Sequence, residues 1–175
     1  MLSNKLAFIF TLFFVSSVSA ALTPRQQAES WVRKQYPKST GKAGLQGVSR
    51  QVAHLSGTTI FSLSQAGSTR PGWKVWVHGE QTGRVVTGAG PRGLIESLAV
   101  PLSKVSIKSN DTKTAKELSV ALMNLASSDS PLVECQSLAN LINCKLAFSR
   151  GLWKNKTETL VIDTNKGQVE SAGAL

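Results

Sequence analysis

The side chains of this sequence that could do acid–base or metal chemistry are few and widely spaced. The two histidines are His54 and His78, and the His78-Gly-Glu80 triplet has the His-x-Glu spacing found in zinc deaminases. The Pro-Cys-x-x-Cys segment that completes such a zinc site is absent from the sequence. His78 and Glu80 fall on one side of an alternating strand, so we expect a surface hydrogen bond or salt bridge between them.

Arrangements typical of hydrolases and of cofactor-binding enzymes do not stand out either. After position 20 the aspartates are Asp111, Asp129 and Asp163, and no Ser–His–acid order, nucleophile elbow or carboxylate pair is visible. The glycines between Gly88 and Gly93 match a dinucleotide-binding fingerprint, but hairpin-like strands precede them and a very short helix follows. We therefore expect a flexible turn there, no cofactor and no enzymatic activity.

The two cysteines, Cys135 and Cys144, are separated by eight residues. In an oxidising compartment such an isolated pair predicts one structural disulfide. A zinc site would need four closely spaced ligands, and a redox pair would need the Cys-x-x-Cys spacing. Closing so short a loop stabilises the fold by roughly 2.5–3 kcal/mol on the chain-entropy model.

The first twenty residues have the layout of a secretory signal peptide. Lys5 precedes an apolar run at 6–15, and small residues at 16–20 place Val18 and Ala20 at the positions that a signal peptidase reads. Spanning a bilayer takes about 20 apolar residues, so this run is too short for a permanent anchor. We expect cleavage near Ala20 and a periplasmic or secreted mature chain without a transmembrane segment.

The positive charge is concentrated in one half of the chain. The formal net charge is +10; residues 21–110 hold twelve Lys and Arg against three acids, whereas residues 111–175 hold seven of each. This asymmetry predicts an anionic partner, such as an envelope polysaccharide or an acidic protein. Nucleic acid is disfavoured because the cations are scattered singly. The alternative is that the charge serves solubility alone.

The first half reads as a helix followed by antiparallel strands. Thr23 is the expected helix cap, Pro24 and Gln26 fit the first helical turn, and Pro37 ends the segment. Short runs rich in β-branched and aromatic residues, separated by glycines, then predict strands. We place these strands at 48–55, 58–64, 73–78 and 84–87, with a turn at 80–83, a short helix at 94–99 and a further strand at 102–107.

The second half repeats this order. Thr114 and Glu117 fit a capping box, and an apolar helical stripe runs from Leu118 to Leu125. Strands are expected at 131–135 and 144–148 around the disulfide loop, in which 138–142 could form a turn of helix, and a final hairpin at 159–163 and 168–171. The sequence thus predicts an α+β fold with antiparallel sheets and a packed helix per half. The expected divisions are 1–20, 21–110 and 111–175, with one shared core.

A shift of 84 residues aligns WKVWVHGEQTGRVVTGAG with TETLVIDTNKGQVESAGA, so that Val77 meets Val161 and Gly83 meets Gly167. The match suggests a duplicated helix-plus-hairpins unit. Shared hairpin-turn chemistry is the alternative explanation.

The segment AESWVRKQYP, followed by strands and then by WKVWVHGEQTGRVV, resembles the PepSY module. In that module a helix ends near a proline and the last hairpin has a V…tG.v turn. The resemblance covers residues 24–88, with a fainter echo in 112–171, where Asp163 supplies an aspartate that the first copy lacks. It implies a cystatin-like α+β fold and a non-enzymatic role in envelope or secreted proteins, including restraint of peptidases.

The predicted partner-binding residues surround one tryptophan. Trp76 shares a strand face with Lys74 and His78, and Arg70 and Arg84 lie nearby in the chain. An exposed tryptophan framed by cations suits sugar rings, a peptide or an acidic protein; burial under a helix is the alternative. We expect an exported accessory protein that helps to assemble an envelope machine. A peptidase inhibitor or pro-region-like module is the alternative, and a small secreted enzyme is the third option.

Overall fold

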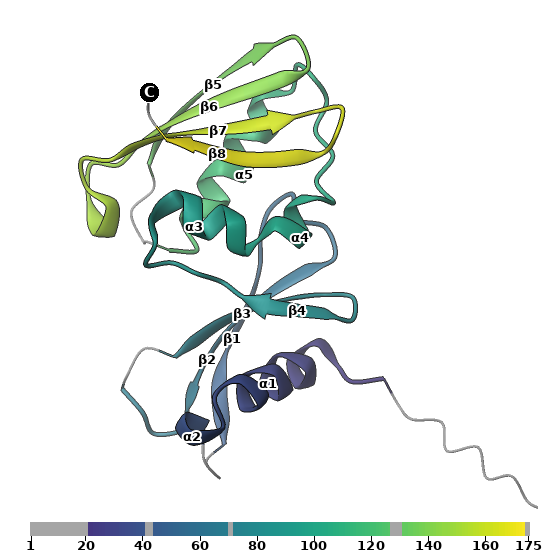
Figure 1. Cartoon of the computed structure of the whole chain (residues 1–175), viewed down its shortest axis with the longest axis vertical. Helices are drawn as coiled ribbons and strands as arrows, with labels where there is room; N and C mark the ends of the chain where they lie inside the picture. Colours follow the sequence, from purple (N-terminus) through teal and green to yellow (C-terminus); the bar gives the residue numbers. More distant parts are fainter. Residues whose placement is uncertain (1–20, 41–43, 70–71, 127–130, 174–175) are drawn as a thin grey trace, which may run out of the picture.

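The computed structural model describes residues 21–40, 44–69, 72–126 and 131–173. Within these residues the chain forms two four-stranded antiparallel sheets, each with its strands in sequence order. Sheet 1 contains β1–β4, sheet 2 contains β5–β8, and a helix precedes each sheet (Figure 1). The predicted α+β class is therefore confirmed.

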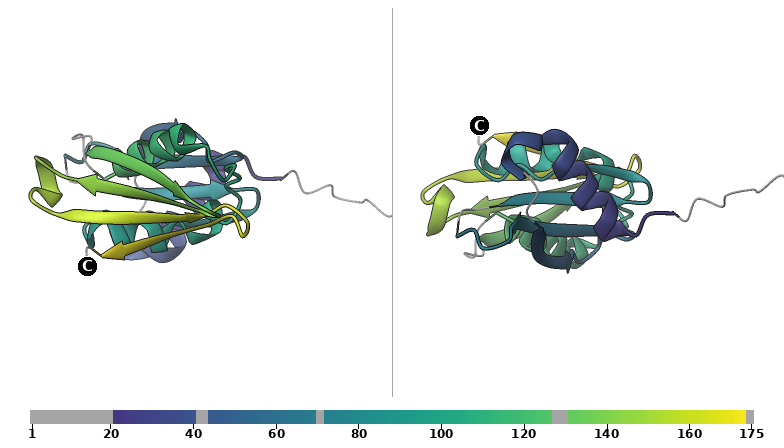
Figure 2. Two further views of the ribbon diagram at one scale, coloured as in Figure 1. Left: turned by 90° about the horizontal axis from the view of Figure 1, so that it is seen from above. Right: turned by 90° about the horizontal axis from the view of Figure 1, so that it is seen from below.

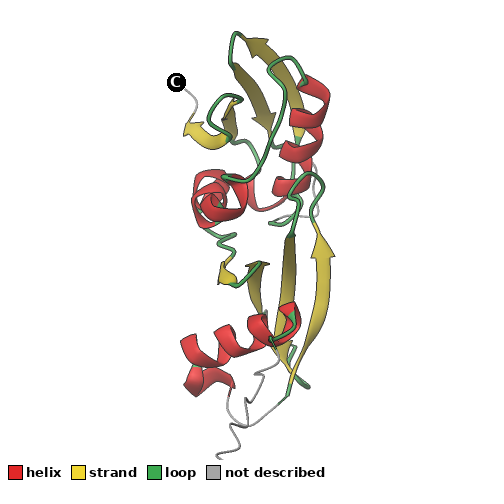
Figure 3. Cartoon of the chain, turned by 90° about the vertical axis from the view of Figure 1, so that its right-hand side faces the viewer, coloured by secondary structure: helices red, strands yellow, loops and turns green. Residues whose placement is uncertain are grey.

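The first half consists of α1 (Pro24–Gln35), α2 (Pro37–Thr40), β1 (Leu45–Gln51), β2 (Thr58–Gln65), β3 (Trp73–His78) and β4 (Gln81–Arg84). Two helices, α3 (Gly90–Ser97) and α4 (Ala99–Leu102), then connect it to α5 (Thr112–Met123). Sheet 2 follows with β5 (Leu132–Leu138), β6 (Leu141–Ala147), a 3-10 turn at Gly151–Trp153, β7 (Thr157–Asp163) and β8 (Gln168–Gly173). The sheets lie one above the other along the molecule, with α3 and α4 between them (Figures 1 and 3).

Helix α1 begins with the capping box that the sequence predicts. The Thr23 hydroxyl accepts from the Gln26 N–H at 3.3 Å, and the Gln26 side chain accepts from the Thr23 N–H at 2.9 Å. Ala28 and Val32 face sheet 1 and are fully buried. The capping box thus fixes where the helix starts, and its apolar stripe fixes which side packs.

The two central strands of sheet 1, β2 and β3, are covered on both faces, whereas β1 is exposed along most of its length. One face packs against α1 in a cluster formed by Phe61, Leu63, Val75 and Val77 with Ala28 and Val32. The opposite face directs Ile60 and Trp76 into a larger cluster that also contains residues of α3, α5 and sheet 2. Because this larger cluster draws on both halves of the chain, the halves share a hydrophobic core.

Sheet 2 is covered on one face by helices. Helix α5 packs over β5 and β6, and α3 packs against β8. The side chains that point toward these helices include the fully buried Ile142, Leu146 and Leu160. The other face looks away from the rest of the molecule, and Figure 2 shows sheet 2 at the opposite end from α1.

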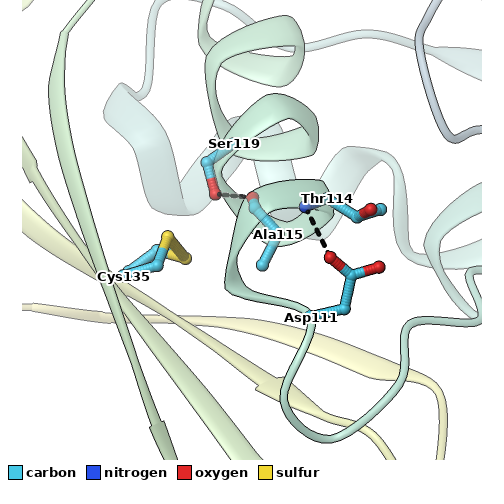
Figure 4. Close-up of a disulfide and its surroundings, with 6 residues drawn as sticks. Asp111, Thr114, Ala115, Ser119 and Cys135 are labelled. Carbon is cyan, nitrogen blue, oxygen red and sulfur yellow. Dashed lines mark hydrogen bonds between the residues drawn. A yellow bond between two sulfur atoms is a disulfide. The ribbon is translucent and has the colours of Figure 1, made fainter.

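Cys135 and Cys144 form the predicted disulfide, with an S–S distance of 2.06 Å. They lie directly opposite each other on β5 and β6, and Cys144 is fully buried. The bridge lies beside the N-terminal part of α5, near Ala115 and Ser119 (Figure 4). It therefore joins two adjacent strands under the helix that covers them.

In the connections between elements, two local predictions are wrong, and one option that the sequence leaves open does not occur. Residues 102–107 do not form a strand: Leu102 ends α4, and Val105 and Ile107 are buried within a loop, so their apolar pattern reflects core packing alone. Residues 138–142 form no helical turn, because β5 and β6 continue to a two-residue turn with Ala139 at a φ of 52°. The β3–β4 turn lies at residues 79–80 rather than 80–83, so β4 begins earlier than expected.

The N-cap of helix α5 is Asp111, three residues before the expected cap Thr114, and the helix begins at Thr112. The Asp111 carboxylate accepts from the Thr114 N–H at 3.0 Å and caps the helix (Figure 4). Hydrogen bonds from the backbone and side chain of Thr114 lower the pKa of the Asp111 carboxyl. Glu117, the expected second member of the box, binds His54 instead.

The 84-residue shift reproduces strand pairing, and it reproduces burial on one face only: Ile60 coincides with Cys144 and Trp76 with Leu160, and all four are buried in the larger cluster. It places the Phe61–Val75 pair of β2 and β3 on the Lys145–Thr159 pair of β6 and β7, so both hairpins share one register. Phe61, however, packs against α1, whereas Lys145 is exposed on the open face of sheet 2. The shift therefore superposes the two sheet faces that point into the shared core, but α1 covers the other face of sheet 1, and among the described residues nothing comparable covers Lys145 on sheet 2.

Within the described ranges, no helix has both the length and the apolarity needed to cross a membrane.

Candidate functional site

The residues predicted to contact a partner are dispersed. Arg70 lies outside the described residues. Lys74, Trp76 and His78 lie on the face of β3 opposite the one that packs against α1, and Arg84 is exposed at the end of β4. The four described residues therefore do not form one exposed patch.

Trp76 is a core residue, so the prediction of an exposed indole is wrong and the alternative, burial under a helix, is confirmed. The side chain is only 7% exposed, and its indole N–H donates to the Ser97 carbonyl of α3 at 2.9 Å. The backbone of Gly83 packs directly against the indole ring, since a Cβ at that position would come within 2.4 Å of a ring atom. The alternating pattern placed Trp76 on the correct face, but α3 covers that face.

Lys74 also serves the fold. Its ammonium group donates to the Leu125 carbonyl, and the Arg50 guanidinium donates to the Asn124 carbonyl at 3.3 Å. These carbonyls follow the last turn of α5, where unpaired C=O groups concentrate negative partial charge. Since α5 has no basic residue in its own last turn, sheet 1 supplies the two cations. Burial and the nearby Arg50 guanidinium lower the pKa of the Lys74 ammonium.

The histidines occupy separate structural positions. His78 shares a hydrogen bond of 2.9 Å with the Thr58 hydroxyl, in place of the contact with Glu80 that the sequence suggests. His54, at a φ of 66°, contacts the Glu117 carboxylate at 2.9 Å and thereby ties the β1–β2 loop to α5. Among the described residues, no group of three or more His, Cys, Asp or Glu side chains is placed to hold a metal ion.

A groove of about 390 Å³ lies between the α3–α4 pair and β8. On the strand side it is lined by four consecutive residues, from Gln168 to Ser171. Successive side chains of a strand point to opposite faces, so a cavity that touches four in a row follows the strand's free edge. Among the described residues β8 pairs with β7 alone, so no strand occupies this edge, and α3 and α4 lie beside it across the groove.

The helical wall of the groove presents one stripe of α3 and its continuation. Arg92, Ile95, Glu96 and Ala99 recur at helical spacing, and Leu102 with Ser103 extends the wall along α4. Ile95, Leu102 and Val169 give the groove an apolar floor. Polar and charged groups surround that floor, so the groove is amphipathic.

The charged rim carries both signs, with one cation and two acids. The Arg92 guanidinium donates to the Glu96 carboxylate at 2.8 Å, and both side chains are largely exposed. This carboxylate raises the pKa of Arg92. Glu170 adds a negative charge on the strand side. The rim can therefore pair with either charge on a bound segment.

Sequence reasoning missed this groove for two reasons. The glycines at 88–93 predict a flexible turn, whereas α3 begins at Gly90 with Pro91 in its first turn. The two walls are also far apart in the chain, so only the tertiary structure places α3 beside β8. The helical stripe from Arg92 to Ala99 was the available signal for one wall.

No protein-family model, no curated protein and no solved structure significantly matches this chain.

Proposed function

We propose that this chain is an exported, non-catalytic accessory protein that binds an extended segment of another protein. The observation that carries the proposal is the groove between α3–α4 and the free edge of β8. A segment lying there would pair its backbone with β8 and become a further strand of sheet 2. Addition of a strand between a sheet edge and a helix is a recurrent mode of peptide recognition.

The shape of the groove favours a polypeptide over a polysaccharide. The edge of β8 offers backbone N–H and C=O groups at the repeat of a strand, which another main chain can match along its length. Ile95, Leu102 and Val169 would receive alternate apolar side chains of that segment. The volume of about 390 Å³ lies within the range of ligand-binding pockets and suits a few residues of one strand.

The positive first half supports a partner that is acidic overall. Lys34, Lys38 and Arg84 are exposed there, while Arg50 and Lys74 are used at the end of α5. Long-range attraction of this kind raises association rates more than final affinity, and it weakens with salt. The leader-like start of the sequence and the Cys135–Cys144 disulfide support export.

The proposal is tested by selecting peptides of about eight residues from a displayed library on the chain that starts at Ala21. Binding of a selected peptide should shift the backbone amide resonances of residues 168–171 and protect them from hydrogen exchange. Ala99→Trp places a large side chain in the groove and should weaken binding by about tenfold or more. Val100→Trp, on the neighbouring 36% exposed residue outside the groove lining, is the matched control.

Equal binding by the Ala99→Trp variant and the wild-type chain would exclude the groove as the site. Binding that survives this substitution but disappears with Lys34→Ala and Lys38→Ala would favour a purely electrostatic partner. Stoichiometric inhibition of an enzyme in a panel of peptidases would favour the alternative that the PepSY resemblance implies.

A further inference from the structure

Strand β5 is the other edge of sheet 2, and it is open. It pairs with β6 on one side, and within the described ranges no backbone hydrogen bond joins its outer side to another segment. Leu132 and Leu138, at its two ends, are 67% and 66% exposed. Figure 1 shows β5 as the outermost strand at this end of the molecule.

The hairpin geometry determines which backbone groups of β5 face outward. Leu138 and Leu141 close a two-residue turn and so form a hydrogen-bonded pair. Hydrogen-bonded and non-hydrogen-bonded pairs alternate along the ladder, which makes Cys135–Cys144 a non-hydrogen-bonded pair. Its Cα–Cα distance of 4.0 Å agrees with that assignment. The N–H and C=O groups of Val133, Cys135 and Ser137 therefore point toward the free edge.

The sequence of this strand, Leu-Val-Glu-Cys-Gln-Ser-Leu, is self-complementary about Cys135. An antiparallel copy centred there pairs the outward backbone groups of Cys135 with those of the second copy's Cys135. On the open face, Leu132 then lies opposite Leu138 of the second copy, and Glu134 lies opposite Gln136. These are the non-hydrogen-bonded positions, at which cross-strand side chains approach most closely.

The charges and composition of β5 suit a second copy. Residues 111–175 carry seven basic and seven acidic residues, so two such halves meet without net repulsion while the basic halves lie outward. Strand β5 contains neither Lys nor Pro, which commonly protect exposed edges, and its one charged residue is Glu134. On the edge strand of sheet 1, in contrast, the Gly47 carbonyl of β1 already accepts from Arg25 at 3.1 Å.

We propose that two copies of this chain associate through antiparallel pairing of their β5 strands about a two-fold axis at Cys135. The two four-stranded sheets become one eight-stranded sheet. On the open face of the joined sheet, Leu132 of each copy lies opposite Leu138 of the other copy, which makes two leucine pairs. This interface goes beyond the proposed peptide groove, and it leaves the groove beside β8 free at each end of the joined sheet.

The experiment measures mass by light scattering and sedimentation on the chain from Ala21 with its disulfide formed. The wild-type chain should dimerise. Leu132→Lys and Leu138→Glu each place two charges opposite leucines in the dimer, and each should raise the dissociation constant by at least about tenfold. Both positions are exposed, so the melting temperature of the monomer should change little. Val48→Lys, at a 71% exposed position on β1, is the matched control and should leave the dimer intact.

Mixing the two variants tests the register itself. A heterodimer of Leu132→Lys with Leu138→Glu contains one Lys–Glu pair and one unchanged leucine pair, so the mixture should regain dimer that neither variant forms alone. A wild-type chain that stays monomeric up to about 1 mM would overturn the proposal. It would also be overturned by a dimer that Leu132→Lys does not weaken, or by variants that fail to rescue each other.

Discussion

The two sheets of this protein share a topology and differ in how their faces are used. In sheet 1, β2 and β3 have α1 on one face and the core around α3 and α5 on the other, so both faces of these strands are used for packing, whereas β1 is largely exposed. Sheet 2 has helices on one face, while its second face, its β5 edge and the groove along β8 remain accessible. Enclosure thus uses the central strands of sheet 1 for packing, whereas sheet 2 keeps the accessible edge and groove on which both proposed interactions depend.

The comparison also changes the role of two basic residues of sheet 1, Arg50 and Lys74. Positive charge in the first half of the sequence predicted a binding surface there. Arg50 and Lys74 instead stabilise the end of α5, which belongs to the second half. A basic residue that the sequence offers for partner binding can thus instead pair with the carbonyl groups at the end of a helix from another part of the chain.

The largest expected effect concerns the enclosure of sheet 1. Trp76→Ala should lower the free energy of unfolding by about 3–5 kcal/mol, because it removes a buried indole and its bond to Ser97. Urea unfolding followed by circular dichroism measures this loss. Trp31→Ala, at a half-buried indole on α1, should cost less. A loss below about 1 kcal/mol would mean that the second face of sheet 1 is open.

The next effect concerns the one-sided sheet 2. Replacing both Cys135 and Cys144 by alanine should lower the free energy of unfolding by about 2–3 kcal/mol, because the unfolded chain gains freedom. Chemical unfolding should give similar free energies of unfolding for the variant and for the reduced wild-type chain. If reductant destabilises the variant as well, the loss does not arise from this disulfide.

A smaller effect tests the contact between sheet 1 and α5. Lys74→Met keeps the length of the side chain but leaves the Leu125 carbonyl without its charged donor, and should cost about 1–2 kcal/mol. Hydrogen exchange should increase most in the last turn of α5. Lys34→Met, at an exposed position on α1, serves as the control and should change stability little. Equal effects of the two substitutions would remove the role assigned to Lys74.

The smallest effect concerns the start of α5 and depends on pH. The pKa of Asp111 is lowered from its ordinary value of 3.8, so its contribution to stability is present above that value and is lost as pH falls through the folded-state pKa. Asp111→Ala should therefore lower the melting temperature at neutral pH, and its difference from the wild-type chain should shrink in acid. Asp111→Asn should keep the cap without that pH dependence. A difference that stays constant with pH would mean that the carboxylate is not the cap.

Local features of the fold were predictable because neighbouring residues determine them. The Thr23 capping box, the antiparallel strands and the bridge between Cys135 and Cys144 follow from short-range hydrogen bonding, side-chain alternation and loop closure. The Asp111 cap was missed because Thr114 and Glu117 matched the same motif a few residues later. Asp111 and Thr114 are both suitable N-caps, and the choice between them depends on how the helix packs.

The sequence by itself determined the α+β class, the main helices and most strands, the charge asymmetry and the cysteine pair. The tertiary structure alone decided that α3 buries Trp76, that sheet 1 supplies cations to α5, and that α3 lies beside β8. Alternation along a strand distinguishes its two faces, but it does not state which face will be covered. That choice depends on the packing of segments far apart in the chain, where burial of apolar area outweighs any local preference.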